Sequence, residues 1–242
     1  MRAISKDMNN IPASLFDGSV PNNLNQVNKH IYATKEVKER LNLLYYKKCA
    51  YCEDTLLNHF KHIDHYRPKK NYYWLAYSWD NLVLCCENCN VNKGTHFKIR
   101  NKQKQYDGET LFQLQTMIKI YDKQENPELI NPEQETNFSH HLKFNFNGQI
   151  EAKTQRMQYT IDTLKLNRDD LVELRLIILN ELRNEILKCI TKFTVIPNYD
   201  FVGAIKELKE KFAAKTTISS TFTAWRLFIL ENFTDFTKMI VK

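Results

Sequence analysis

The sequence predicts an α+β protein that is mainly α-helical, and three observations lead to this expectation. Glycine occurs 5 times and proline 6 times in 242 residues, against roughly 17 and 12 in a chain of average composition. Residues 167–242 carry apolar side chains at helical spacing. Residues 49–97 instead hold five of the six cysteines, many aromatic residues and little helical periodicity. We therefore expect a small, cysteine-rich core embedded in a helical body.

Residues 1–48 are expected to form a polar arm followed by helices. The first 20 residues are polar and mixed, without a hydrophobic signal core. From residue 22 onward, apolar side chains recur at steps of three and four, which predicts two helical segments. Thr34 is suited to cap the second segment. The apolar positions are Leu24, Val27, Ile31, Val37, Leu41 and Leu44.

Residues 105–242 are expected to be mostly helical, with one extra β-hairpin at 142–152. Apolar side chains alternate on both sides of Asn147-Gly148, which is a strong hairpin signal. Beyond the hairpin, three apolar stripes at helical spacing predict long amphipathic helices. We expect these stripes to form the core of the helical body, with docking of a partner as a second role.

The net charge, the lack of long apolar segments and the cysteine content limit the classes of protein to which this sequence can belong. The net charge is +7 and the pI is near 9.0, which favours a polyanionic partner. No segment approaches the ~20 apolar residues needed to span a bilayer, so we expect no membrane association. We expect a cytoplasmic protein, and in a reducing compartment cysteines serve as metal ligands or buried thiols more often than as disulfides.

Two C-x-x-C pairs define the cysteine-rich core. Cys49 and Cys52 are separated by 33 residues from Cys86 and Cys89. Two such turns can place four thiolates around one ion, which is the arrangement that structural zinc prefers. Unmetallated thiols or disulfides remain the alternatives. Zinc bound by four sulfurs has no open position, so this ion would hold the fold rather than catalyse.

The residues between and after these pairs carry a second pattern. Asp-His-x-x-Pro begins at Asp64, Asn-Leu begins at Asn81, and the second cysteine pair continues as Cys-Asn-x-x-Lys-Gly from Cys89 to Gly94. This combination resembles the HNH endonuclease family, whose fold is the ββα-metal finger. The resemblance implies a hairpin and a short helix within residues 49–104.

The resemblance also implies a role for each matching residue. Asp64 and Asn90 would bind the catalytic Mg²⁺ or Mn²⁺, and His65 would be the general base. Asn81 would brace the loop that orients His65, and Lys93 would touch phosphate or the charge of the transition state. The chemistry is consistent with this, because a hard cation on oxygen ligands and a neutral imidazole are what phosphodiester hydrolysis requires.

Basic residues flank this motif and are expected to contact nucleic-acid phosphates. DNA is the default substrate, while RNA, including tRNA, stays open. The residues are Arg67, Lys69, Lys70, Lys98 and Arg100.

A narrower resemblance extends from about residue 48 to residue 175. Cys-Ala-Tyr-Cys-Glu, His-Tyr-Arg-Pro-Lys and Tyr-Trp-Leu-Ala-Tyr-Ser-Trp are similar to a bacterial HNH subfamily that includes the Septu nuclease component PtuB and a retron-associated effector. This implies a nuclease subunit of an anti-phage complex with PtuA, an ABC/SMC-like ATPase. The chain has no G-x-x-x-x-G-K-[ST] motif, so nucleotide switching would belong to the partner.

Two alternative functions remain compatible with the sequence. One is a non-catalytic zinc module that binds nucleic acid or a protein partner, with a vestigial active site. The other is a stand-alone restriction-type HNH nuclease, which would cut without any partner.

Overall fold

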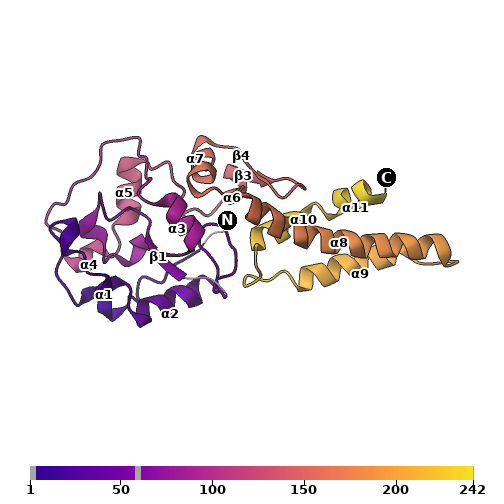
Figure 1. Cartoon of the computed structure of the whole chain (residues 1–242), viewed down its shortest axis with the longest axis horizontal. Coiled ribbons are helices and arrows are strands. Elements are labelled where there is room, and N and C mark those ends of the chain that lie inside the picture. Colours follow the sequence, from indigo (N-terminus) through magenta and orange to yellow (C-terminus); the bar gives the residue numbers. More distant parts are fainter. Residues whose placement is uncertain (1–3, 58–60, 242) are drawn as a thin grey trace. The chain divides into compact units, whose positions relative to one another are not determined.

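The computed structural model describes residues 4–57 and 61–241, and they form two compact units. The first unit runs to Leu142 and includes Ala152–Leu166, and the second comprises Lys143–Glu151 and Asn167–Lys242 (Figure 1). These units do not follow the divisions 1–48, 49–104 and 105–242 expected from the sequence. The reason is that segments on both sides of the cysteine-rich core pack onto it.

The N-terminal part of the first unit is built from short helical turns. It contains the 3₁₀ helices η1 (Ala13–Phe16) and η2 (Leu24–Gln26), followed by α1 (Lys29–Tyr32) and α2 (Lys35–Leu44). The Thr34 side chain accepts a hydrogen bond from the backbone N–H of Val37 and caps α2, as predicted. The first predicted helical segment is divided between η2 and α1.

The core of the first unit is an antiparallel hairpin followed by a helix. Strand β1 (Lys61–His65) pairs with β2 (Leu82–Cys86), with His65 opposite Leu82. Helix α3 (Glu87–Lys93) begins directly after β2 and packs against both strands. The connection between the strands contains η3 (Tyr73–Leu75) and η4 (Trp79–Asn81). The expected ββα core is therefore confirmed.

The rest of the first unit is helical. It contains α4 (Leu111–Leu114), α5 (Ile118–Glu125), α6 (Phe138–His141) and α7 (Gln155–Leu164). The single helix expected at residues 111–120 is interrupted at Gln115. Its buried side chain accepts from the Trp79 N–H and donates to the Tyr77 carbonyl. This side chain joins the interruption to the β1–β2 connection.

The predicted hairpin at 142–152 is confirmed. It consists of β3 (Leu142–Phe144) and β4 (Ile150–Ala152). Gly148 in its turn has φ +79°, and a Cβ atom there would lie 2.9 Å from the Val172 carbonyl oxygen. This turn therefore requires glycine, both for its backbone conformation and for its close approach to a helix.

The second unit is helical apart from the hairpin residues. Its helices are α8 (Asp169–Val195), α9 (Phe201–Ala214), α10 (Thr223–Glu231) and α11 (Phe233–Val241). The Trp225 indole donates to the Arg175 carbonyl, and the Arg175 guanidinium donates to the Gly148 carbonyl. The stripes on α8 and α10 are largely buried, whereas on α9 only Phe212 is buried. Among the described helices, none combines the length and apolarity needed to cross a bilayer.

The N-terminal arm is anchored in the core, contrary to what its polar composition suggested. The backbone N–H of Ile4 donates to the Pro132 carbonyl. The Lys6 ammonium is buried, 2.7 Å from the Glu133 carboxylate, and also donates to the carbonyls of Trp79 and Leu82. Burial lowers the pKa of Lys6 and raises the pKa of Glu133. The arm therefore fixes the segment on both sides of Asn81.

We expect Lys6→Ala to destabilise the fold by about 3–5 kcal/mol, because it leaves the Glu133 carboxylate buried without its cation. Urea unfolding followed by circular dichroism measures this free energy. Lys29→Ala removes an exposed lysine and serves as control, with an expected change within about 0.5 kcal/mol. Equal stability of the two variants would show that the arm does not anchor the core.

Candidate active site

Four cysteine sulfurs form a buried cluster beside the hairpin. The sulfurs of Cys49, Cys52, Cys86 and Cys89 all lie within 4.8 Å of one another. The first pair sits in a turn that is attached to β2, because the backbone N–H of Ala50 donates to the Leu84 carbonyl at 2.8 Å. All six cysteines of the chain are free thiols. Four buried thiols in tetrahedral reach are the donor set of a structural zinc site.

The pKa values of the Cys49 and Cys86 thiols are shifted by burial and by hydrogen bonds between the sulfurs. Hydrogen bonds from Cys49, Cys52 and Cys89 lower the pKa of Cys86, which also accepts from the Cys89 backbone N–H. Burial raises the pKa of Cys49. The cluster thus favours negative charge on the sulfur at the start of α3, where the helix dipole adds to the effect.

The carboxylate of Asp64 is held between two buried donors. It accepts a hydrogen bond of 2.7 Å from the Tyr51 hydroxyl and lies 3.0 Å from the Lys93 ammonium. Tyr51 stands between the two cysteines of the first pair. The cysteine cluster therefore positions Asp64 directly, through a side chain of its own turn.

Lys93 lies inside the protein instead of on its surface. Its side chain is fully buried, and its ammonium also donates to the His65 carbonyl at 2.7 Å. The sequence-based expectation that Lys93 touches phosphate is not supported by this position, because the cation is committed to Asp64 and to the end of β1. The structure instead makes it an internal counter-ion.

His65 at the end of β1 is a neutral imidazole. Its Nε2 lies 3.0 Å from the Ala76 carbonyl oxygen, and the ring of Tyr32 packs edge-on at 4.6 Å. Burial lowers the pKa of His65 to about 3. Because a carbonyl can only accept, we assign the proton to Nε2, and this leaves the lone pair on Nδ1.

Asn81 joins the two ends of the loop that orients His65. Its Oδ1 accepts from the Arg67 backbone N–H at 2.8 Å. Its Nδ2 donates to the carbonyls of Leu75 and Arg67 at 3.1 and 3.2 Å. Ala76, whose carbonyl holds His65, follows Leu75 directly. The contacts of Asn81 are therefore those that bracing this loop requires.

Asn90 lies on the inner side of α3. It is half-buried and precedes Lys93 by three residues, which places both on the same face of the helix. Lys93 contacts Asp64, so this face is the one that meets β1. An amide oxygen and a carboxylate are thus carried by two elements that pack together.

The structure contradicts the expectation that Arg67 contacts nucleic-acid phosphates. Its side chain has no exposed surface and forms ion pairs with Asp122 and Glu125. The guanidinium also lies 4.9 Å from the ring centroid of Phe97. A buried cation with two carboxylate partners cannot reach a phosphate. Arg67 instead attaches the loop after β1 to α5.

The other basic residues differ in their availability. The Lys69 ammonium donates to the Tyr32 hydroxyl at 2.9 Å, close to His65. Lys70 is exposed and the Lys98 side chain is 66% exposed. Arg100 donates two hydrogen bonds to Glu128, at 2.9 and 3.1 Å. Lys70 and Lys98 therefore present charge to solvent, Lys69 is half-buried against Tyr32, and Arg100 is largely engaged by a carboxylate.

Sequence reasoning missed three residues that shape this site. Tyr32, Tyr51 and Ala76 contact His65 or Asp64. Only Tyr51 has a signal in the sequence, because it lies within the first cysteine pair. The contributions of Tyr32 and of the Ala76 carbonyl depend on the course of the loop.

Comparison with known proteins identifies the class of this core. Residues 49–96 match the family model described as HNH endonuclease, so this core is similar to an HNH endonuclease domain. The match covers the cysteine cluster, β1, β2 and α3.

The similarity beyond this domain is to proteins named as Septu proteins. The chain is 32% identical over 163 residues to the Septu protein PtuB of Bacillus mycoides (strain KBAB4), which covers 60% of this chain and 51% of that protein. It is 33% identical over 134 residues to PtuB of Bacillus thuringiensis, covering 54% and 41%. It is also 26% identical over 184 residues to the Septu protein PtuA of B. mycoides, covering 70% and 24%. The chain spans about half the length of the PtuB relatives it matches.

We expect Cys86→Ser to lose bound metal and to unfold the first unit. Binding free energies of about 10–16 kcal/mol at such sites exceed the stability of many domains. Zinc release with a colorimetric chelator and thermal unfolding measure the two effects. Cys85→Ala is the matched control, because strand alternation directs this neighbouring side chain to the opposite face. A Cys86→Ser protein with full metal content and unchanged unfolding would exclude a structural role for the cluster.

Proposed function

We propose that this protein is a metal-dependent HNH endonuclease that hydrolyses phosphodiester bonds of DNA as the nuclease subunit of an anti-phage complex. The single observation that carries the proposal is that a carboxylate and an imidazole held in one orientation occupy consecutive positions at the end of β1. His65 follows Asp64 at the end of β1, with its Nε2 held by the Ala76 carbonyl. The match of residues 49–96 to HNH endonucleases supports the same reaction.

Two metals fit the donor sets of the first unit. The four sulfurs suit Zn²⁺ in a closed structural site. Asp64 and Asn90 offer hard oxygen donors, which suit Mg²⁺ or Mn²⁺ with water completing the coordination. When bound, the divalent cation supplies neutralisation of the charge on the phosphate and the leaving oxygen.

His65 acts as general base in this proposal. Its Nδ1 accepts the proton of the attacking water, while the Nε2–H bond to the Ala76 carbonyl keeps the ring in one tautomer and orientation. The same carbonyl stabilises the imidazolium that forms. A pKa lowered by burial keeps the base unprotonated throughout the physiological range of pH.

The remaining residues hold this pair in position. Asn81 braces the loop that carries Ala76. Lys93 orients Asp64 and the end of β1 at the same time. In this proposal Lys93 is a positioning residue, because its ammonium has no path to the substrate.

The charge of the chain supports DNA as the substrate, and its similarity to Septu proteins supports a PtuA-type ATPase as the partner. The net charge of +7, the exposed lysines Lys70 and Lys98, and the half-buried Lys69 suit phosphate contacts. Similarity to proteins named PtuB, and to part of one named PtuA, supports a place in the Septu system beside an ATPase subunit. These similarities give no support to a retron link. Co-purification of the full chain with a co-expressed PtuA-type ATPase tests the assembly.

We expect His65→Ala to fold, to keep its zinc and to lose at least about 100-fold in cleavage rate, as is typical on removal of a general base. Cleavage of a labelled DNA duplex by the complex, with Mg²⁺ present, measures this rate. His62→Ala serves as control because His62 lies on the same strand and its Nε2 has no hydrogen-bond partner in the part of the chain that the structure describes. Unchanged cleavage by a folded His65→Ala protein would refute the assignment of the base. A wild-type complex that binds DNA but never cuts it would favour the non-catalytic alternative.

We expect Tyr51→Phe to leave the zinc and the fold in place and to raise the Mg²⁺ concentration needed for half-maximal cleavage about tenfold or more. The change removes only the hydroxyl that orients Asp64, and partners of metal ligands contribute on this scale. A magnesium titration of the cleavage rate measures the shift. Tyr46→Phe, which changes a half-exposed tyrosine of the same unit, is the control. An identical magnesium dependence for Tyr51→Phe and wild type would show that this contact does not position the ligand.

A further inference from the structure

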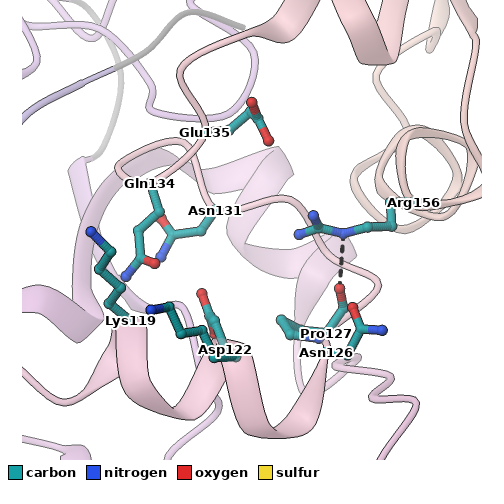
Figure 2. Close-up of a pocket in the computed structure, with 9 residues that line it drawn as sticks. Lys119, Asp122, Asn126, Pro127, Asn131, Gln134, Glu135 and Arg156 are labelled. Carbon is teal, nitrogen blue, oxygen red and sulfur yellow. Dashed lines mark hydrogen bonds between the residues drawn. The ribbon is translucent and has the colours of Figure 1, made fainter.

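A polar pocket in the first unit lies outside the site described above. It has a volume of about 260 Å³, and its walls come from α5, the segment after α5 and α7 (Figure 2). In Figure 2, Lys119 and Asp122 rise from α5 and Arg156 reaches in from the other side. The lining residues are Lys119, Asp122, Lys123, Asn126, Pro127, Asn131, Gln134, Glu135 and Arg156.

The two carboxylates of this pocket already have donors. Asp122 is ion-paired with the buried Arg67 at 2.5 Å. Glu135 accepts hydrogen bonds from His141 at 2.9 Å and from the Asn137 backbone N–H at 2.8 Å. The pocket therefore has little unmet demand for a cation.

Several of its hydrogen-bond donors, in contrast, have no acceptor among the residues that the structure describes. The Arg156 Nε donates to the Pro127 carbonyl at 3.0 Å, which fixes the guanidinium, and no described residue accepts from its two terminal amino groups. Asn131 is 97% buried, since only 3% of its surface is exposed. Its Oδ1 accepts from the Glu133 N–H, while its Nδ2 has no partner within residues 4–57 and 61–241. A buried amide donor without an acceptor has a substantial energetic cost unless a ligand or water supplies one.

Two further cations face the same space. Lys119 and Lys123 lie one helical turn apart on α5, so they share a face of that helix. Neither forms an ion pair or a side-chain hydrogen bond with the residues that the structure describes. With Arg156, whose charge also acts on Asp122 and Glu135, they bring three positive charges to a pocket that holds two carboxylates.

We propose that this pocket binds a phosphate group. A phosphate offers several acceptor oxygens to the Arg156 fork, to the two ammonium groups and to the Asn131 amide, and charge-assisted bonds of this kind are the strong ones. The group belongs either to a nucleic-acid strand that passes the nuclease or to a free nucleotide. The pocket borders the loop of the candidate active site, because Asp122 holds Arg67, whose backbone is bonded by Asn81.

The binding test uses the full-length protein with His65→Ala and no added Mg²⁺, so that cleavage plays no part in the result. Calorimetric titrations with inorganic phosphate, with AMP and with a short single-stranded DNA measure affinity. We expect Lys119→Gln combined with Lys123→Gln to weaken phosphate-dependent binding at least about tenfold, as for the loss of charged hydrogen bonds. Lys29→Gln combined with Lys38→Gln removes the same charge from exposed positions of the same unit and should leave affinity within about twofold.

Asn131→Asp provides a second, nearly isosteric test. It keeps the acceptor for the Glu133 N–H but replaces the free donor by a negative charge, so we expect it to abolish binding of the anion. Thermal unfolding checks that this variant is folded. If it is not, the binding affinity of the Lys119→Gln, Lys123→Gln double variant is the test of the proposal.

The ligands distinguish the source of the phosphate. Binding of inorganic phosphate or AMP that responds to the pocket variants indicates a free nucleotide, whereas a response with DNA alone indicates a strand phosphate. The proposal is overturned if the wild-type pocket binds none of the three ligands. It is equally overturned if the pocket variants bind as tightly as the control pair. Since no step depends on catalysis, a failure here is separate from a failure of the proposed nuclease activity.

Discussion

The meeting of two cysteine pairs is the constraint on which the first unit depends. Cys49 and Cys52 lie in a turn that is bonded to β2, while Cys86 and Cys89 span the junction of β2 and α3. The four sulfurs therefore fix the turn, the hairpin and the helix relative to one another. Since Tyr51 lies inside the first pair and holds Asp64, the same constraint extends to the candidate active site.

Buried cationic side chains connect the other elements of the first unit to this core. Lys93 ties α3 to β1, Arg67 ties the loop after β1 to α5, and Lys6 ties the N-terminal arm to the residues around Asn81. Each cation is matched by carboxylates or carbonyls, because an unpaired buried charge would be strongly destabilising. Part of the chain's positive charge thus serves the fold, and only the remainder is available for a polyanion.

Catalytic competence and substrate binding have different physical requirements here. In the proposed mechanism the general base must keep one tautomer and one orientation, and the contacts of His65 with Tyr32 and the Ala76 carbonyl hold the ring in this way. Phosphate binding needs exposed or unsatisfied donors, and these lie elsewhere, on surface lysines and in the pocket around Arg156 and Asn131. The first unit combines both because its core is small and its surrounding helices supply the cationic surfaces.

Local patterns in the sequence were sufficient for the features that depend on neighbouring residues. The spacing of the cysteines, the Asn-Gly turn at Gly148, the cap at Thr34 and the amphipathic helices of the second unit all follow from short-range geometry. For the core around Asp64 and His65, the resemblance to HNH endonucleases, and not local geometry, implied the hairpin and the helix. Whether a charged side chain faces water or the interior depends instead on residues far away in the sequence. Arg67 pairs with Asp122 and Glu125, which lie 55 and 58 positions away. Lys93 pairs with Asp64, which lies 29 positions away. A sequence pattern gives the charge of a side chain. Only the packed tertiary structure decides whether that side chain forms an ion pair with a carboxylate in the interior or faces solvent.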